Sequence, residues 1–511
     1  MVPFVGLSPL STSLLYLSIL IIAVCGIVYE LIIGAVSSYL WGDSVFYFSV
    51  TIGLYMSAMG LGAFVSKFIK KSLFDVFVFS EILIGGVGGC SALFLFWTHT
   101  VGDWYEVSMV AVTLLIGALV GIEIPLLIRI MEQQENLRRN LAHVLTYDYI
   151  GGLFGALLFP LFFLPVLGLI KTALVLGVLN VLVALSNFVR HRFLLRFGLP
   201  LFLFSLSVSM GLGYFLFTSQ TQEELLEQRL YRDQVIFSRQ TPYQQITLTR
   251  WHKDIRLFIN GGLQFSSLDE YRYHESLVHL PFAVVPQAKN LLVLGGGDGL
   301  ALREILKYAQ VKNVTLVDLD PEMTRIFKTE PILLALNQKS LTNPKVKIVN
   351  QDAYKFIEQS EAFYDVILVD LPDPSHTALA KLYSREFYHL LGRRLSANGA
   401  LVTQSTSPFF AREAFWCIHK TLKDTGLFVL PYQVEVPSFG NWGFQLATHY
   451  PVLPDTLKIQ LKDLKYLNSN TLHVLFTFPE DLYFPLEQLQ INTLMHPVLL
   501  NYYAKGWNGI R

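Results

Sequence analysis

NLLVLGGGDGLALREILKYAQVKNVTLVDLD, residues 290–320, decides the fold of the second half of the chain. The apolar run Leu291 to Leu294 predicts a buried parallel strand, which breaks into three glycines before a helix that starts near Asp298. A second apolar run, Val314 to Val317, ends on Asp318. In a nucleotide-binding βαβ unit, a carboxylate at this position binds the ribose hydroxyls. The stretch therefore predicts a nucleotide site on a parallel sheet.

Asp298 follows the glycines directly and has two interpretations. A carboxylate there repels a phosphate or a carboxylate and attracts an ammonium group. Asp is also a favourable residue at a helix N-terminus, where its carboxylate accepts from free backbone N–H groups. The two roles are compatible, and both stay open.

The composition separates the chain into two halves. Its 511 residues are 52% hydrophobic and only 15% charged, which is too apolar for an ordinary soluble enzyme. Residues 1–218 hold 10 of the 39 basic and 10 of the 39 acidic side chains, which predicts a membrane domain there. A net charge of zero without a basic stripe argues against a nucleic-acid partner. Three cysteines without metal-ligand spacing predict neither a metal site nor a disulfide framework.

A transmembrane helix needs about 20 mostly apolar residues. Seven stretches of the first half meet this requirement: Leu14 to Leu40, Val45 to Val65, Phe74 to Trp97, Val107 to Ile130, Tyr147 to Leu167, Thr172 to Val189 and Phe197 to Thr218. We expect a multi-pass protein of the inner membrane. Basic residues gather in alternate loops, so the positive-inside rule places the N-terminus inside and the second half outside. Nucleotide-like cofactors are found inside the cell. The side of the membrane on which the second half lies therefore stays open.

Four acidic residues fall within or at the edge of these spans: Glu30, Glu81, Glu123 and Asp148. Ionisable groups in a membrane are expensive and usually face the interior of the helix bundle. They are compatible with a cation-binding vestibule. They are equally compatible with protonated or hydrogen-bonded side chains that hold helices together.

The second half alternates strands and helices. A short polar helix at Glu223 to Tyr231 predicts a linker. Strands are expected at Gln234 to Arg239, Gln244 to Arg250, Ile255 to Asn260, Val346 to Val349, Val366 to Val369, Ala400 to Gln404 and Phe428 to Val434, with a hairpin turn at Gly261 and Gly262. The βα alternation after Leu291 predicts a doubly wound sheet.

The predicted fold is a multi-pass α-helical membrane domain followed by an α/β Rossmann-like domain of the class I methyltransferase type, with a small β-hairpin or β-sheet subdomain before it. We expect a seven-span transmembrane domain at residues 1–218, a linker and small β subdomain at 219–285, a catalytic domain at 286–450 and a C-terminal extension at 451–511. The extension carries no chemistry that the sequence indicates.

Acidic residues follow the predicted strands: Asp298, Asp318, Asp352 and the pair Asp370 and Asp373 in VDLPDP. The carboxyl ends of parallel strands line the ligand crevice of an open sheet, so these acids are expected to converge. Such a site suits a cationic ligand. A helix-capping role explains any one of the acids, but it explains less well two acids three residues apart beside prolines.

Several ordered motifs resemble spermidine synthases, the polyamine aminopropyltransferases, over roughly Tyr231 to Thr448. They are TPYQQI, DEYRYHESLVHLP, LVLGGGDG, YDVILVDLPDP and LYSREFY. With seven spans ahead of them, they resemble the membrane-fused bacterial branch of that family. The resemblance implies transfer of an aminopropyl group from decarboxylated S-adenosylmethionine, a co-substrate, to putrescine, without a permanent cofactor. The other implied partners are a lipid bilayer and further copies of the chain in a homo-oligomer.

The resemblance also implies roles for named residues. Those that contact the methylthioadenosine part of the donor are Gln244, Asp318, Asp352, Ala353 and Thr377. Those that hold the amine groups are His274, Asp298, Asp370, Leu371, Pro372 and Asp373. Gln264 and Tyr273 match supporting positions. Asp370 matches the family's proton acceptor, which is needed because an alkylamine is protonated at neutral pH and must lose a proton before it attacks. No metal is implied, because the positive sulfur already activates the leaving group.

Some positions depart from the family pattern. Asp318 replaces a usual Glu, Asn260 a usual Asp, Thr377 a usual Pro, and Phe439 a Tyr of the acceptor pocket. The last change makes putrescine less certain than the reaction type. Two alternatives stay open: a methyltransferase that binds S-adenosylmethionine itself, and a membrane transporter or polyamine sensor whose synthase-like half does not turn over.

Overall fold

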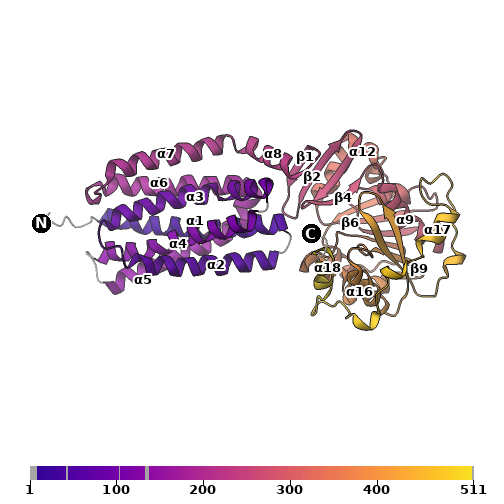
Figure 1. The fold of residues 1–511 in the computed structure, drawn as a ribbon. Coiled ribbons are helices and arrows are strands. Elements are labelled where there is room, and N and C mark those ends of the chain that lie inside the picture. Colours follow the sequence, from indigo (N-terminus) through magenta and orange to yellow (C-terminus); the bar gives the residue numbers. More distant parts are fainter. Residues whose placement is uncertain (1–8, 42–43, 103, 133–136, 509–511) are drawn as a thin grey trace. The chain divides into compact units, whose positions relative to one another are not determined.

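The computed structural model describes residues 9–41, 44–102, 104–132 and 137–508 (Figure 1). The chain forms two compact units, Met1–Asp233 and Gln234–Arg511. The polar helix that the sequence predicted as a linker is part of the first unit. The predicted β subdomain, catalytic domain and C-terminal extension together form the second.

The first unit is built from long apolar helices that run back and forth. They are α1 (Pro9–Trp41), α2 (Ser44–Ser66), α3 (Leu73–Val101), α4 (Tyr105–Glu132), α5 (Leu137–Leu158), α6 (Leu164–Arg190) and α7 (Gly198–Phe217), followed by the polar α8 (Ser219–Leu230). Six helical stretches among the described residues are long and apolar enough to cross a membrane.

The predicted fifth and sixth spans form one of these stretches. Residues Arg138–Arg190 are helical over 53 residues, because the π-helical turn Phe159–Phe163 joins α5 to α6. The backbone bends at Gly168, whose φ of 72° and ψ of −174° are not helical. Glycine tolerates this conformation because it has no Cβ. The sequence predicted seven separate spans. The structure has six continuous stretches among the described residues, because the fifth and sixth predicted spans lie in one of them.

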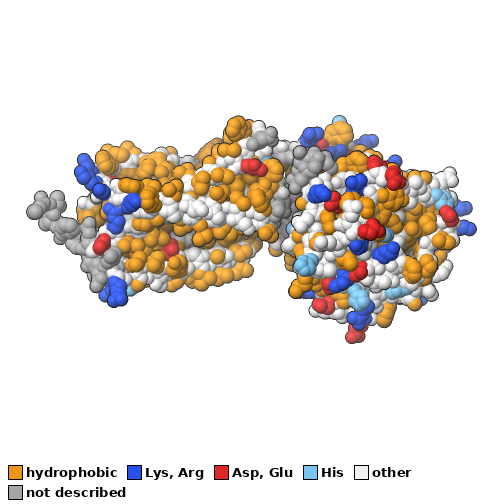
Figure 2. Space-filling view, turned by 60° about the horizontal axis from the view of Figure 1, so that its bottom comes forward, with side chains coloured by type: hydrophobic (Ala, Val, Ile, Leu, Met, Phe, Trp, Pro, Cys, Tyr) orange, Lys and Arg blue, Asp and Glu red, His pale blue; other side chains and the backbone are white. Residues whose placement is uncertain are grey.

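Glycines bring α2 and α4 into backbone contact. A Cβ atom on Gly62 would lie 2.0 Å from the carbonyl oxygen of Ala118, and one on Gly121 would lie 2.1 Å from that of Met59. Such close approach is typical of small residues at helix interfaces in membranes. Outside these interfaces, hydrophobic side chains cover most of the visible face of the unit, with Lys and Arg gathered at one end (Figure 2).

The second unit begins with a four-stranded antiparallel sheet in the order β1-β2-β3-β4. Its strands are β1 (Gln234–Gln240), β2 (Gln245–Trp251), β3 (Asp254–Ile259) and β4 (Gly262–Ser266). The turn between β3 and β4 uses Asn260 and Gly261, with φ of 48° and 79°, and Gly262 already belongs to β4. The predicted turn at Gly261 and Gly262 is therefore shifted by one residue, because a two-residue hairpin turn of this type needs positive φ at both positions and Asn tolerates it.

The main sheet has seven strands in the order β10-β11-β9-β8-β5-β6-β7. They are β5 (Asn290–Gly295), β6 (Asn313–Asp318), β7 (Val346–Asn350), β8 (Tyr364–Asp370), β9 (Leu395–Gln404), β10 (Phe428–Val436) and β11 (Gly440–Thr448). The five strands from β9 to β7 are parallel. β11 is antiparallel to its neighbours β9 and β10, so β10 runs in the same direction as the five. This is the expected Rossmann-like arrangement. The sequence did not predict β11.

Helices cover both faces of this sheet. They are α9 (Glu270–Val284), α10 (Leu300–Ile305), α11 (Pro321–Thr329), α12 (Pro331–Leu336), α13 (Ala353–Gln359), α14 (Thr377–Ala380), α15 (Arg385–Arg394), α16 (Arg412–Lys423), α17 (Ser469–Leu475) and α18 (Leu499–Asn508). Alternate residues of β5 enter different cores: Leu291 and Val293 pack into one cluster, Leu292 and Leu294 into the other. Both faces of the central strand are thus buried, which explains its continuous apolar run.

Candidate active site

The glycine turn after β5 brings the backbone against the end of β8. Gly295 has a φ of 81°, and a Cβ atom there would lie 2.0 Å from the carbonyl oxygen of Asp370. Asp298 lies two residues before Leu300, the first residue of α10. Its carboxylate accepts a hydrogen bond from the Leu300 N–H at 2.8 Å. The helix-terminal role of Asp298 is therefore present. Burial raises the pKa of its carboxyl group to about 6, although the charge of His274 opposes the shift.

Asp318 stands at the end of the neighbouring strand β6. Its carboxylate accepts from the N–H groups of Gly297, at 3.0 Å, and Asp320, at 2.9 Å, which ties it to the glycine turn. Burial raises the pKa of Asp318 to about 6. The amide of Gln244 does not contact Asp318 but donates to the buried Asp320 carboxylate at 3.0 Å, as does the Thr241 hydroxyl at 2.8 Å. Asp320 thus connects the small sheet to this edge of the large one.

Asp352 lies after β7 and caps α13. Its carboxylate accepts from the N–H of Tyr354 at 2.9 Å and from the Lys381 ammonium at 2.6 Å. Burial opposes ionisation, but the hydrogen bond and charge of Lys381 and the two backbone N–H donors together outweigh it and lower the pKa of Asp352. Ala353 is the buried first residue of α13, whereas Thr377, the first residue of α14, is exposed. Asp352 and Ala353 follow β7, the strand next to β6, whereas Thr377 lies in the segment after β8.

Asp370 ends β8, next to the glycine turn. The Tyr273 hydroxyl from α9 donates to its carboxylate at 2.6 Å. Burial raises the pKa of Asp370, while the charge of His274 and the hydrogen bond from Tyr273 work against the shift. Gln264, the other supporting residue, donates to the carbonyl of Gly262 in its own hairpin at 3.1 Å. Among the described residues, Tyr273 therefore hydrogen-bonds to an acid of the edge, whereas Gln264 bonds within its own hairpin.

Asp373 lies in the loop after β8 and is held by donors from the end of β9. Thr406 donates to its carboxylate through the hydroxyl at 2.9 Å, and Gln404 through the amide at 3.3 Å. Gln404 also donates to the carbonyl of Leu371 at 2.6 Å. The Tyr383 hydroxyl donates to the carbonyl of Pro372 at 3.0 Å.

The environment of Asp373 is strained as well as buried. Burial raises the pKa of Asp373 to about 6 against the opposing hydrogen bonds of its donors. Thr406 adopts a φ of 58°, which is unfavourable for a β-branched residue and costs about 1–3 kcal/mol. The contacts of its hydroxyl and backbone hold it there. Strain of this kind is commonly found at ligand sites.

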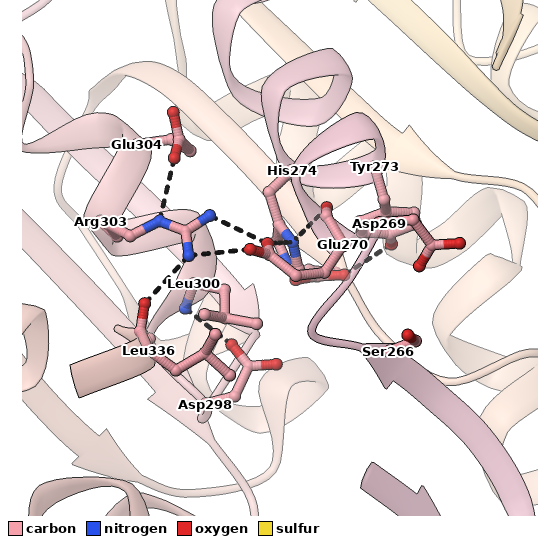
Figure 3. A network of polar contacts seen from close by, with 12 residues as sticks. Ser266, Asp269, Glu270, Tyr273, His274, Asp298, Leu300, Arg303, Glu304 and Leu336 are labelled. Atoms are coloured by element: carbon pink, nitrogen blue, oxygen red, sulfur yellow. Dashed lines mark hydrogen bonds and ion pairs between the residues drawn. The ribbon is translucent and has the colours of Figure 1, made fainter. Parts of the chain in front are cut away.

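His274 belongs to a buried charged network on α9 and α10 (Figure 3). Its Nδ1 donates to the carboxylate of Glu270 at 2.8 Å and to the Glu270 carbonyl at 2.9 Å. Arg303 binds the Glu270 carboxylate with two hydrogen bonds of 2.9 Å and reaches Glu304 at 3.0 Å. Burial disfavours the imidazolium, but the hydrogen bond and charge of Glu270 outweigh it and raise the pKa of His274 to about 9. His274 is thus cationic at neutral pH.

Sequence reasoning missed several residues of this edge: Thr241, Glu270, Asp320, Tyr383, Gln404 and Thr406. A sequence signal existed for most of them. Thr241 lies in TPYQQI, Glu270 in DEYRYHE, Asp320 in the stretch at residues 290–320 and Tyr383 in LYSREFY, while Gln404 ends a predicted strand. Thr406 comes from a segment without a recognisable motif. No three His, Cys, Asp or Glu side chains gather as a metal site within the part of the chain that the structure describes.

The family model and the related sequences agree on one family. The Spermine/spermidine synthase domain model matches residues 270–452. The chain is 44% identical over 506 residues to a polyamine aminopropyltransferase of Leptospira interrogans, covering 97% of this chain and 99% of that protein. It is 42% identical over 516 residues to polyamine aminopropyltransferase 2 of Ralstonia nicotianae, covering 98% and 99%. A crystal structure of spermidine synthase in complex with the transition state analogue AdoDATO has a TM-score of 0.45 and 24% identity, and covers 48% of this chain and 85% of that chain.

Proposed function

Because the chain belongs to the polyamine aminopropyltransferase family, we propose that it transfers the aminopropyl group of decarboxylated S-adenosylmethionine to putrescine. The products are spermidine and methylthioadenosine. The observation that carries the proposal is the pair Asp370 and Asp373, one beside the glycine turn and the other in the loop that follows β8, in a protein related over nearly its whole length to polyamine aminopropyltransferases. The same relationship leaves the methyltransferase alternative without support.

The donor fits the edge formed by β5, β6 and β7. Asp318 accepts hydrogen bonds from the ribose hydroxyls, and Gln244, Asp352, Ala353 and Thr377 surround the rest of the methylthioadenosine part. Asp298 binds the ammonium group of the aminopropyl chain. S-adenosylmethionine carries a carboxylate in addition, which Asp298 repels, so the site selects the decarboxylated donor.

The acceptor fits the end of β8. Asp373 binds the distant ammonium group of putrescine, and the backbone of Leu371 and Pro372 lines its path. Asp370 takes the proton from the attacking amine, and Tyr273 fixes the orientation of Asp370. The cationic His274 repels an ammonium group, so beside the reacting nitrogen it favours the neutral amine that attacks.

The reaction needs no further activation of the donor. The amine nitrogen forms a bond to the carbon next to the sulfonium as the carbon–sulfur bond breaks. The electron pair of that bond goes to sulfur, which leaves as the neutral thioether of methylthioadenosine. Holding both substrates in line supplies much of the rate enhancement.

Asp370→Asn tests the assignment of the base. We expect turnover to fall about 100-fold or more, the usual scale for a general base, while donor affinity is retained. Products are measured by mass spectrometry with a panel of donors and acceptors. Asp365→Asn is the matched control, because Asp365 lies on the same strand and accepts only backbone and Ser396 donors at the opposite end. Near-normal turnover of the Asp370 variant excludes it as the base.

We also propose that the first unit spans a lipid bilayer and that the protein assembles into homo-oligomers. Large apolar side chains are strongly exposed on several helices, with 75% exposure for Leu161, 70% for Leu199 and 68% for Met210. Exposed apolar surface of this extent suits lipid and not water. The oligomeric state is tested by light scattering of the purified protein in detergent.

A second candidate function of the first unit is to hold or pass a polyamine. Glu81 on α3 and Glu123 on α4 are 0% and 1% exposed, and their carboxylate oxygens meet no hydrogen-bond donor among the described residues. Buried acids of this kind usually mark an ion or proton pathway. Labelled putrescine or spermidine and protein in liposomes test this function, with Glu81→Gln and Glu123→Gln as variants. If the parent neither binds nor moves polyamine, the unit is an anchor.

A further inference from the structure

The chain forms a strained turn directly after strand β9, beside the candidate acceptor site. Thr406 lies two residues after Gln404, the last residue of β9, and has a φ of 58°. A β-branched residue rarely adopts a positive φ, because its side chain crowds the backbone, whereas glycine adopts it readily. The conformation is therefore unfavourable for Thr406, and contacts with other residues must hold it.

Backbone hydrogen bonds with β11 hold this turn. The N–H of Gly443 donates to the Thr406 carbonyl at 2.8 Å, and the N–H of Ser405 donates to the Gly443 carbonyl at 2.8 Å. A Cβ atom on Gly443 would clash with the Phe415 ring and would lie 3.0 Å from the Thr406 carbonyl oxygen. The close approach of β11 therefore depends on a glycine, and it fixes the position of Thr406.

The turn directs one hydrogen-bond donor to each carboxylate oxygen of Asp373. The Thr406 hydroxyl donates to Oδ2 at 2.9 Å, and the Gln404 amide donates to Oδ1 at 3.3 Å. The Gln404 amide is itself oriented, because its oxygen accepts from the Thr406 N–H at 3.0 Å while its nitrogen donates to the Leu371 carbonyl at 2.6 Å. Thr406 thus acts on Asp373 directly through its hydroxyl and indirectly through its N–H.

The two residues differ in their access to a ligand. Thr406 is 0% exposed, whereas Asp373 keeps part of its surface exposed. A ligand can therefore contact Asp373 but not Thr406. A carboxylate has about four lone-pair sites, so Asp373 can accept from an ammonium group in addition to its two donors from the turn. The hydrogen bonds of Thr406 and Gln404 also oppose the rise in the pKa of Asp373 that burial causes, and so support its charged form.

We propose that Thr406 is a positioning residue that makes the acceptor site selective for diamines, because it holds the Asp373 carboxylate in one orientation for the second ammonium group of the acceptor. The proposal rests on the proposed function, in which Asp373 binds that ammonium group. A monoamine has no second ammonium group, so the orientation of Asp373 contributes nothing to its binding. Glycine at position 406 would remove the strain, but it has no hydroxyl to donate to Asp373.

The test compares putrescine with butylamine, which has the same carbon chain but a single amino group, in the full-length protein in detergent. Thr406→Val removes the hydroxyl and keeps the shape of the side chain. We expect kcat/KM for putrescine to fall about tenfold, the scale of a hydrogen bond to a charged group, while kcat/KM for butylamine stays at the value of the parent. Thr406→Ser, which keeps the hydroxyl, is expected to retain the preference of the parent for putrescine.

Two further variants control for effects on folding. Thr403→Val removes another fully buried hydroxyl of β9, which donates to the Gln404 carbonyl at 2.9 Å and forms no bond with Asp373 among the described residues. We expect it to leave the ratio of kcat/KM for putrescine to that for butylamine unchanged. Thr406→Ala lacks the hydroxyl but is less crowded at a positive φ than valine. It replaces Thr406→Val if that variant does not bind methylthioadenosine as the parent does.

The inference is overturned if the hydroxyl-free variant keeps the parent's ratio of kcat/KM for the two amines, or if it lowers both values equally. The same loss of preference in Thr403→Val would also overturn it, because any buried hydroxyl of β9 would then have this effect. A parent that transfers no aminopropyl group to either amine refutes the proposed function instead. Where transfer is absent or too slow to measure, the Kd values of the two amines in the presence of methylthioadenosine provide the same comparison and still test Thr406.

Discussion

At the residue scale, the candidate site is a row of carboxyl groups that burial makes weaker acids. The pKa values of Asp298, Asp318 and Asp373 are each raised to about 6, and that of Asp370 is raised as well. Cationic substrates require the ionised forms. The carboxyl groups of the site therefore change their charge close to neutral pH, a range in which the ammonium groups of the substrates stay charged.

The pH dependence follows from these raised values. In the free enzyme, Asp298 and Asp373 gain protons as the pH falls through about 6, so kcat/KM is expected to fall there and not near pH 4. Above this range the carboxylates are charged and substrate binding is supported. The measurement is kcat/KM for each substrate between pH 5 and 9. A profile that stays flat down to pH 5 contradicts the raised pKa values.

A single residue, Asp298, is also expected to determine which donor the site selects. Asp298→Asn removes a negative charge, which weakens the attraction of the donor's ammonium group and the repulsion of a carboxylate. We expect the parent protein to bind decarboxylated S-adenosylmethionine more tightly than S-adenosylmethionine. In the variant, the difference between the two affinities should be smaller. Calorimetric titration with both compounds measures it. Equal affinities in the parent count against the role of Asp298.

At the element scale, the glycine turn after β5 brings its backbone so close to the end of β8 that no side chain fits between them at Gly295. Gly295 and Gly426 both have positive φ, 81° and 86°, but only the former faces a backbone oxygen; a Cβ on Gly426 would meet nothing within 4 Å. A comparison of substitutions at the two positions therefore separates the free-energy cost of the positive φ from the cost of the close backbone contact.

Gly295→Ala is expected to destabilise the protein more than Gly426→Ala. The positive φ costs about 1–2 kcal/mol for an alanine at either site. At Gly295 the backbone of β5 and β8 must also move apart, which displaces Asp370. Thermal unfolding in detergent and donor titration measure both effects. Equal losses of stability, with donor binding intact, would show that the turn tolerates a side chain.

Elements with a strong local pattern could be predicted from the sequence. β5 and β6 extend the apolar runs at 291–294 and 314–317 by one residue at each end, because buried parallel strands require such runs. β11 could not, since its sequence GNWGFQLAT has two glycines and pairing with β9 and β10 determines it. The strand-end acids were predictable in the same way, whereas Thr406 reaches Asp373 through a tertiary contact alone.

At the scale of the whole molecule, one chain combines a helical unit with exposed apolar surface and an α/β unit with a polar site. A single helix would be enough to anchor an enzyme. The first unit has six apolar stretches, one of them long enough for two crossings, and it buries two acids without donors among the described residues. These features exceed the needs of an anchor.

Membrane insertion has a direct test. After expression in bacteria, we expect the protein to stay in the membrane fraction through washes with high salt and alkaline carbonate, because apolar contacts with lipid do not depend on charge. Detergent should release it. Release by salt or carbonate alone would mean that the protein associates with the membrane only through its surface, and that the apolar helices pack elsewhere.

The C-terminal segment at residues 486–508 has a consequence for the order in which the protein becomes functional, because its buried Asn492 side chain donates to the carbonyls of Ala380 and Tyr383, both at 3.0 Å. A ribosome makes the chain from its N-terminus, and domains generally fold in that order. The helical unit, the donor edge and the Asp370 strand are all synthesised before residues 486–508. A nascent or prematurely terminated chain that lacks these residues has every side chain that we propose to bind the donor. Its Tyr383, which donates to the Pro372 carbonyl beside Asp373, lacks the contact with Asn492. Such a chain is expected to bind the nucleoside part while its acceptor site is incomplete, so competence for transfer is the last property acquired during translation.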